Sequence, residues 1–165
     1  MGLFGIVIVV LTVTSASTTA LLTECPRGWT EWQDHCYYCF LEPKTWEDAD
    51  TICKNYNGYL ASIHSRQEND KINEVCASLF DLWIGYNDKG WEGIWTWSDS
   101  TAVEYTNWES GQPDGESGLI DGDVSCAMQS NELLIPLPGS GGEWVDENCN
   151  DEHAFTCKSK LHEAQ

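Results

Sequence analysis

Basic side chains are scarce in this 165-residue chain, in which 8 Lys and Arg residues stand against 27 Asp and Glu residues, a formal net charge of −19 at pH 7. Proteins that bind nucleic acid hold its phosphates with clustered positive charge. The shortage of basic residues therefore excludes nucleic acid as the partner. A negative charge of this size keeps a secreted protein soluble and also suits the binding of calcium or another cation.

Long apolar segments are also missing. The most apolar stretch, residues 3–13, is about half the roughly 20 residues that a membrane-spanning helix needs. Small residues follow it as far as Ala20, as they do before the cleavage site of a secretory signal. We therefore predict a signal peptide over residues 1–20 and a secreted, extracellular domain over residues 21–165 with no membrane span. A short N-terminal anchor is the alternative.

Recognisable catalytic motifs are absent. The sequence has no G-x-S-x-G, H-E-x-x-H or phosphate-binding loop, and its histidines, His35, His64, His153 and His162, occur singly. A catalytic triad that forms only in the folded chain would leave no such signature. Since no residue favours catalysis, we predict a binding protein and not an enzyme.

Cysteine, by contrast, is plentiful. The cysteines are Cys25, Cys36, Cys39, Cys53, Cys76, Cys126, Cys149 and Cys157. An even number in a secreted chain predicts a full set of disulfides. Zinc sites of cysteine usually show paired C-x-x-C modules, and only residues 36–39 form one here. The count alone does not determine the pairing.

Two amphipathic helices are predicted in the first half of the mature chain. Thr45 and Asp48 resemble a capping box, and apolar residues then recur at helical spacing until residues 57–58. Ser65 and Glu68 open the second helix, whose apolar stripe runs from Ile72 through Cys76 to residue 79. Strand-like pieces lie at residues 36–40, 83–84, 94–97, 125–129, 143–145 and 155–157. A long loop, rich in Gly, Pro and Asp, spans roughly residues 107–142, and loops of that length are usually functional.

Two oxygen-rich segments, residues 112–123 and 143–152, each lead into or across a cysteine. If Cys126 pairs with Cys149, Asp123 and Asp146 come within reach of one ion. Calcium prefers six to eight oxygen ligands of the kind that Asp, Glu, Asn and Gln supply. The alternative is that these acids are only solvated loop charges.

Several motifs together identify a family. They are Cys25-Pro-Arg-Gly-Trp29, His35-Cys-Tyr-Tyr38, Leu60-Ala-Ser-Ile-His64, Trp83-Ile-Gly-Tyr86, Trp95-Thr-Trp97, Gln112-Pro-Asp114 and Trp144-Val-Asp146. With these, the mature chain resembles a C-type lectin-like domain over nearly its whole length. The resemblance implies an α+β fold with two helices, small antiparallel sheets and a long loop region, stapled by disulfides.

The resemblance also implies three disulfides. These pair Cys25 with Cys36, Cys53 with Cys157, and Cys126 with Cys149. Because Cys76 lies on the apolar stripe of the second helix and Cys39 on the first strand, we favour an internal fourth bridge between them. The alternative is a bridge between chains through Cys39 or Cys76, which would give a covalent homodimer with paired sugar sites.

In this family a tripeptide with a central Pro contributes to the choice of sugar, and Gln112-Pro-Asp114 resembles the form found in galactose binders. Matched motif by motif, Gln112, Asp114 and Asp146 correspond to residues that hold the family's calcium ion. Val145 stands where the family has Asn. The motif that the resemblance implies is therefore incomplete at this position.

Further departures concern the residues before Cys126. Val124-Ser125 replaces a common Glu-Asp pair, so Asp123, or else Asp121, becomes the candidate for a fourth calcium ligand. The family's accessory calcium position is matched by Asp88 and Glu92, with no acidic residue at its other two places. Among the tryptophans, Trp91, Trp108 and Trp144 are candidates to stack on a sugar.

The predicted function is a calcium-dependent lectin that binds galactose or N-acetylgalactosamine-type sugars on glycoconjugates. Recognition of microbial surfaces in innate immunity is the family's common role. Two alternatives remain. One is the same fold with a degenerate calcium site, which binds sugar without calcium or binds a protein ligand. The other is an acidic matrix protein that holds mineral through its charge.

Overall fold

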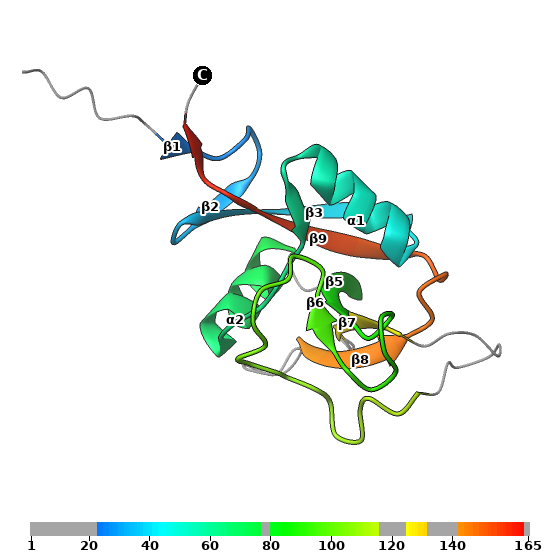
Figure 1. Cartoon of the computed structure of the whole chain (residues 1–165). Helices are drawn as coiled ribbons and strands as arrows, with labels where there is room; N and C mark the ends of the chain where they lie inside the picture. Colours follow the sequence, from blue (N-terminus) through cyan, green and yellow to red (C-terminus); the bar gives the residue numbers. More distant parts are fainter. Residues whose placement is uncertain (1–22, 77–79, 116–124, 132–141, 164–165) are drawn as a thin grey trace, which may run out of the picture.

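The computed structural model describes residues 23–76, 80–115, 125–131 and 142–163 of the chain. Helices α1 (Trp46–Asn55) and α2 (Arg66–Val75) lie against a central sheet (Figure 1). The strands are β1 (Thr23–Glu24), β2 (Thr30–Trp32), β3 (His35–Lys44), β4 (Gly58–Leu60), β5 (Leu82–Asn87), β6 (Thr96–Trp97), β7 (Cys126–Ser130), β8 (Glu143–Glu147), β9 (His153–Lys160) and β10 (His162–Glu163). The predicted α+β class is confirmed.

The central sheet has the strand order β2-β3-β9-β5-β7-β8, and β4 and β6 pair with β9 and β5. Strand β5 runs parallel to β9 through the pairs Leu82 with Ala154 and Trp83 with Phe155. The other pairings between the named strands are antiparallel. Most of the small antiparallel sheet expected from the resemblance is thus joined into one central sheet through a parallel junction, and β1 and β10 form a separate two-stranded sheet.

Both helices begin where the capping boxes predict. The hydroxyl of Thr45 accepts a hydrogen bond from the Asp48 backbone N–H, and that of Ser65 accepts one from the Glu68 N–H. Helix α1 ends before Asn57, whose positive φ of 56° ends the helical path. Helix α2 ends at Val75, earlier than predicted, and residues 77–79 of the predicted stripe lie outside the described residues.

Four disulfides tie these elements together. Cys25 is bonded to Cys36, Cys53 to Cys157, Cys126 to Cys149, and Cys39 to Cys76. The three pairings implied by the resemblance are therefore confirmed. The fourth is internal, as we favoured, and joins β3 to the end of α2. With every cysteine paired in this way, Cys39 and Cys76 have no thiol left for a bridge between chains.

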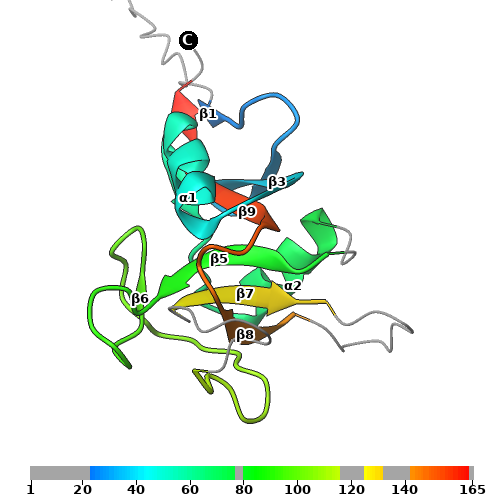
Figure 2. The same cartoon turned by 90° about the vertical axis from the view of Figure 1, so that its right-hand side faces the viewer.

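The apolar core is divided by the sheet into two clusters. One cluster gathers Ile63, Ile72 and Ile84 with the buried ring of Trp144 beneath α2. The other packs α1 against Leu60 and the Cys53–Cys157 disulfide. Figure 2 shows α1 close to β3 and β9, while β7 and β8 lie in the other half of the molecule.

Several sequence predictions fall outside this description. The signal peptide at residues 1–20 and the candidate ligands Asp121 and Asp123 are not among the described residues. Within the described part of the chain, no helix is long and apolar enough to cross a membrane.

Candidate functional site

The segment that carries Gln112 runs beside β8. The backbone N–H of Trp144 donates to the carbonyl of Asn107, and the N–H of Glu109 donates to the carbonyl of Trp144. A turn follows, in which the N–H of Gln112 donates to the Glu109 carbonyl at 3.0 Å. The peptide bond between Gln112 and Pro113 is cis. This backbone path brings the Gln112-Pro-Asp114 motif next to Asp146.

Gln112, Asp114 and Asp146, all predicted from the sequence, form one hydrogen-bonded group. The carboxylate of Asp146 accepts the N–H of Asp114 at 3.1 Å and that of Gly115 at 2.8 Å. The side-chain amide of Gln112 donates to the Asp114 carboxylate at 3.1 Å. The amide oxygen of Gln112 accepts the backbone N–H of Asp146 at 3.4 Å. The motif alone gave no sign that Gly115 belongs to this group.

Asp146 is the buried member of the group, with 4% of its surface exposed. Asp114 is exposed and Gln112 is half-buried. A buried carboxylate needs hydrogen-bond partners, and the two N–H groups of the loop provide them. Asp146 therefore holds the loop in place, while the side chain of Asp114 lies at the surface beside that of Gln112.

The side chains of β8 point alternately to its two faces, and this alternation sets the direction of Asp146. Trp144 and Asp146 share one face of the strand, and the intervening Val145 lies on the other face. Val145 packs against the apolar cluster that contains Cys126 and Cys149. The position at which the family carries Asn is therefore turned away from Asp146 as well as lacking an oxygen.

Polar contacts from α2 fix the start of β8. Trp144 is completely buried, and its indole N–H donates to the Asn69 side-chain oxygen at 2.8 Å. The carbonyl of Gly142 accepts the side-chain amides of Asn69 at 2.9 Å and Asn107 at 2.7 Å. The strand that carries Asp146 is thus tied both to the helix and to the segment leading to Gln112.

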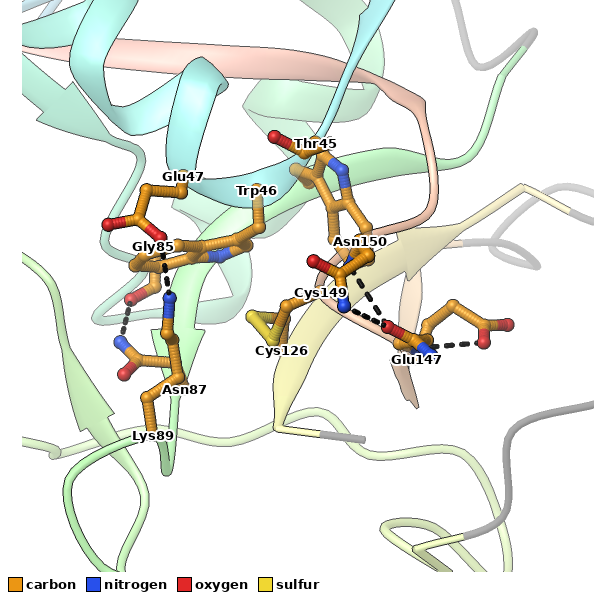
Figure 3. Close-up of a disulfide and its surroundings, with 12 residues drawn as sticks. Thr45, Trp46, Glu47, Gly85, Asn87, Lys89, Cys126, Glu147, Cys149 and Asn150 are labelled. Carbon is orange, nitrogen blue, oxygen red and sulfur yellow. Dashed lines mark hydrogen bonds and ion pairs between the residues drawn. A yellow bond between two sulfur atoms is a disulfide. The ribbon is translucent and has the colours of Figure 1, made fainter. Parts of the chain in front are cut away.

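The far end of β8 is fixed by the Cys126–Cys149 disulfide, which Figure 3 shows beside the ring of Trp46. The backbone N–H of Trp46 donates to the carbonyl of Cys149 at 3.0 Å. Over the same ring lies the ammonium group of Lys89, 5.1 Å from the ring centroid. These contacts join the loop region to the first turn of α1.

The described residues do not fit a resident calcium ion of the family's kind. Calcium needs six to eight oxygen ligands, and Gln112, Asp114 and Asp146 offer three side chains. Both oxygens of Asp146 already accept backbone N–H groups, and Val145 faces the core. Among the described residues, no group of three His, Cys, Asp or Glu side chains is placed to hold a metal ion. A complete set would require Asp121 or Asp123, which lie outside them.

At the accessory calcium position, one of the two matched residues, Asp88, has the burial that a ligand would have. Asp88 is 3% exposed, and one oxygen of its carboxylate accepts the N–H of Gly93 at 2.7 Å. Its other oxygen has no hydrogen-bond partner within the described part of the chain. A buried oxygen of this kind is what a carboxylate that binds a cation would show. Glu92, the other matched residue, is exposed. A single buried oxygen does not make a metal site.

The tryptophans suggested for stacking on a sugar differ in access. Trp144 is buried, and Trp108 packs between Trp95 and Tyr86. Trp91 is 77% exposed at the tip of the turn that Asp88 holds. Trp83 and Trp97 belong to the core, and Trp95 is half-buried against it. Of the three candidates, only Trp91 offers an open ring.

Comparison with known proteins determines the family. The sequence model of the Lectin C-type domain matches residues 42–159. The chain belongs to this C-type lectin family. The C-type lectin lectoxin-Lio1 of Erythrolamprus poecilogyrus is 32% identical over 153 residues, which cover 88% of this chain and 86% of that protein.

Solved structures of the family share the fold. The carbohydrate-recognition domain of cow CD23, crystallised in the presence of a GlcNAc2Man3 oligosaccharide, has a TM-score of 0.73 at 30% identity, covering 86% of this chain and 99% of that one. A calcium-independent type II antifreeze protein has a TM-score of 0.72 at 28% identity, covering 86% and 98%. The C-type lectin fold thus occurs in proteins described as binding sugar and in one described as independent of calcium.

Proposed function

We propose that this C-type lectin domain is secreted and binds galactose or N-acetylgalactosamine-type sugars on glycoconjugates. The observation that carries the proposal is the hydrogen-bonded group of Gln112, Asp114 and Asp146, which gathers the family's sugar-choosing motif at the surface of the long loop. The Gln-Pro-Asp order of the motif supports the galactose class.

The chain's own residues account for sugar binding as follows. The carboxylate of Asp114 accepts hydrogen bonds from sugar hydroxyls, and the amide of Gln112 offers both a donor and an acceptor. Asp146 holds the backbone of residues 114–115, so the loop loses little conformational freedom when sugar binds. A single site of this size is weak, and a non-covalent homodimer would raise the avidity for clustered glycans.

Calcium-dependent binding is the second candidate. It is favoured by the gathering of three oxygen-bearing side chains, which are the ligand types that calcium prefers. Val145, which has no side-chain oxygen, and Asp146, whose two oxygens accept loop N–H groups, favour the calcium-free form of the proposal.

A glycan array in millimolar calcium and in excess EGTA tests both. We expect galactose-type spots under both conditions, and loss of these spots in Asp114→Ala. The control is Glu31→Ala, which removes an exposed carboxylate of β2, outside both oxygen-rich segments, and should leave binding unchanged. Spots that appear only with calcium would support the second candidate. Binding that survives Asp114→Ala would show that the site lies elsewhere.

A further inference from the structure

A second concave site lies away from the Gln112 loop. A cavity of about 470 Å³ is formed where β4 and the end of β9 meet the turn after β6, and Tyr59, His64, Asp99, Thr101, Lys158 and Lys160 contribute to its lining. Figures 1 and 2 both show the C-terminal end of β9 far from the yellow-green segment that ends at residue 115. The cavity is therefore separate from the Gln112 site.

The polar groups of this cavity are held rigidly. Asp99 accepts hydrogen bonds from the Ser62 hydroxyl at 2.6 Å and from the Thr101 hydroxyl at 2.6 Å. One nitrogen of the His64 ring, Nε2, lies 3.2 Å from both of these hydroxyls. Burial raises the pKa of Asp99, but the hydrogen bonds from Ser62 and Thr101 outweigh it and lower the pKa overall. The cavity thus has an ionised acceptor whose position is fixed.

Its charges nearly cancel, unlike those of the chain as a whole. The ammonium group of Lys158 is neutralised by Glu68, at 2.6 Å, and also donates to the carbonyl oxygen of Ser62. His35, at the rim, is paired with Asp34. Lys54, near the Tyr59 ring, is paired with Asp50. The remaining charges of the lining are one negative, on Asp99, and one positive, on the exposed Lys160. A cavity without surplus charge does not select an anion or a cation. It suits a neutral ligand that both donates and accepts hydrogen bonds.

The cavity also has an aromatic component. Tyr59 is 40% exposed, and on the strand β4 it stands opposite Lys158 of β9. Small-molecule sites commonly combine an apolar surface with a few fixed polar groups, in cavities of about 300–1,000 Å³. Tyr59 with Asp99, Thr101 and Lys160 provides this combination at the size of one sugar ring.

We propose that this cavity is a second binding site, for a neutral hexose-sized polyol, and that it works without calcium. The aromatic ring of Tyr59 contacts the apolar face of the sugar ring, and the sugar hydroxyls donate to Asp99 and to the hydroxyl oxygen of Thr101 and accept from Lys160. The site does not depend on the Gln112 loop. It would let one chain contact a branched glycan at two places.

The test is a titration of the 15N-labelled oxidised protein in EGTA, followed by amide chemical shifts, with methyl β-galactoside, methyl α-mannoside and sodium sulfate as separate probes. We expect at least one of the two sugars to shift the amides of Tyr59, Thr101 and Lys160 in a saturable way with a Kd in the millimolar range. Tyr59→Ala should weaken this response roughly three- to tenfold. Phe80→Ala, which removes a similarly exposed ring outside the cavity, should not.

Gln112→Ala separates this inference from the proposed function. It should abolish any response at the Gln112 loop and leave the cavity response unchanged. Sugar-induced shifts at the loop alone, a cavity response to sulfate alone, or an undiminished cavity response in Tyr59→Ala would each overturn the inference. Lys160→Ala gives a second measurement should Tyr59→Ala fold poorly, with the same expected weakening.

Discussion

The molecule has two parts that are stabilised in different ways: a base, formed by α1, β3 and β9, and the loop region of residues 107–149, which includes β7 and β8. In the base, β3 and β9 pair along most of their length, the rings of Phe40 and Phe155 stack at 4.8 Å, and Cys53–Cys157 closes the chain. In the loop region, directional hydrogen bonds to Gly142 and Asp146 hold the backbone. The base therefore confers stability, while the loop region places exposed polar groups without covering them with apolar side chains.

The largest expected effect is the loss of unfolding free energy when a disulfide of the base is removed, compared with the loss for a disulfide of the loop region. Removing Cys53–Cys157 with a double Ala variant frees a separation of 104 residues and should cost about 4–5 kcal/mol in the loop-entropy model. Removing Cys126–Cys149, which closes 23 residues of the loop region, should cost about 3 kcal/mol. Guanidinium unfolding of the two variants measures both. Equal losses would remove the distinction between base and loop region.

A buried ion pair gives the next largest effect. Glu68 lies between Lys158, at 2.6 Å, and the hydroxyl of Tyr37, also at 2.6 Å. Glu68→Gln leaves the buried ammonium group without its counter-charge and should cost about 3 kcal/mol of unfolding free energy. The variant Glu74→Gln, in an exposed ion pair with Lys71, is the control and should lose about 0.5 kcal/mol or less.

The same pair predicts a pH dependence. Burial raises the pKa of Glu68, but Lys158, Tyr37 and the His64 N–H together outweigh burial and hold the pKa below its ordinary value of 4.5. Because the folded pKa is the lower one, this contribution to stability is complete above about pH 4.5 and is lost as the pH falls through the folded pKa. Unfolding between pH 7 and pH 3 should show a steeper acid limb for the native protein than for Glu68→Gln. Parallel limbs would contradict the assignment.

Asp146→Ala should separate stability from binding. It removes the acceptor of two loop N–H groups and should cost about 1–2 kcal/mol, while galactose binding at the loop should be lost. Calorimetry with methyl β-galactoside and urea unfolding measure the two effects. A variant that keeps its sugar affinity would show that the loop does not need this anchor.

Val145→Asn should have the smallest effect on binding. The side chain lies on the face of β8 opposite Asp146 and packs in the apolar cluster, so a new amide there adds no ligand beside Asp146. We expect calcium affinity to change by less than about twofold, with a stability loss of about 1 kcal/mol. Calcium titration by calorimetry decides this. A large gain in affinity would mean that β8 turns at this position when calcium is present.

Most of the fold could be predicted from local signals. Thr45 and Ser65 cap their helices through side chains that the sequence shows directly, and the short apolar and aromatic strand segments stand out in the sequence. The three-residue strands β2 and β4 were missed, because such short strands are defined by their partners β3 and β9. The parallel meeting of β5 and β9 depends on contacts between distant segments, which no local pattern encodes.

The candidate site could be predicted only as a set of residues. The motif indicated Gln112, Asp114 and Asp146, and these do come together. It did not indicate that Asp146 would be committed to backbone N–H groups, or that Val145 would face the core, since both depend on the direction in which β8 runs past the loop. The second cavity combines residues from four separate segments, and no spacing between them is regular.

Gly142 has a consequence for the evolution and engineering of this domain. Its N–H donates to the carbonyl of Ser130, and its own carbonyl is gripped by amide groups from α2 and from the segment before Gln112. The chain before residue 132 and the chain after residue 141 are therefore held together by the hydrogen bonds of Gly142. The entropic cost of closing a loop between two fixed ends rises only slowly with the number of residues in the loop. This interval is thus a natural place to graft or diversify a recognition segment while the geometry around Asp146 is kept.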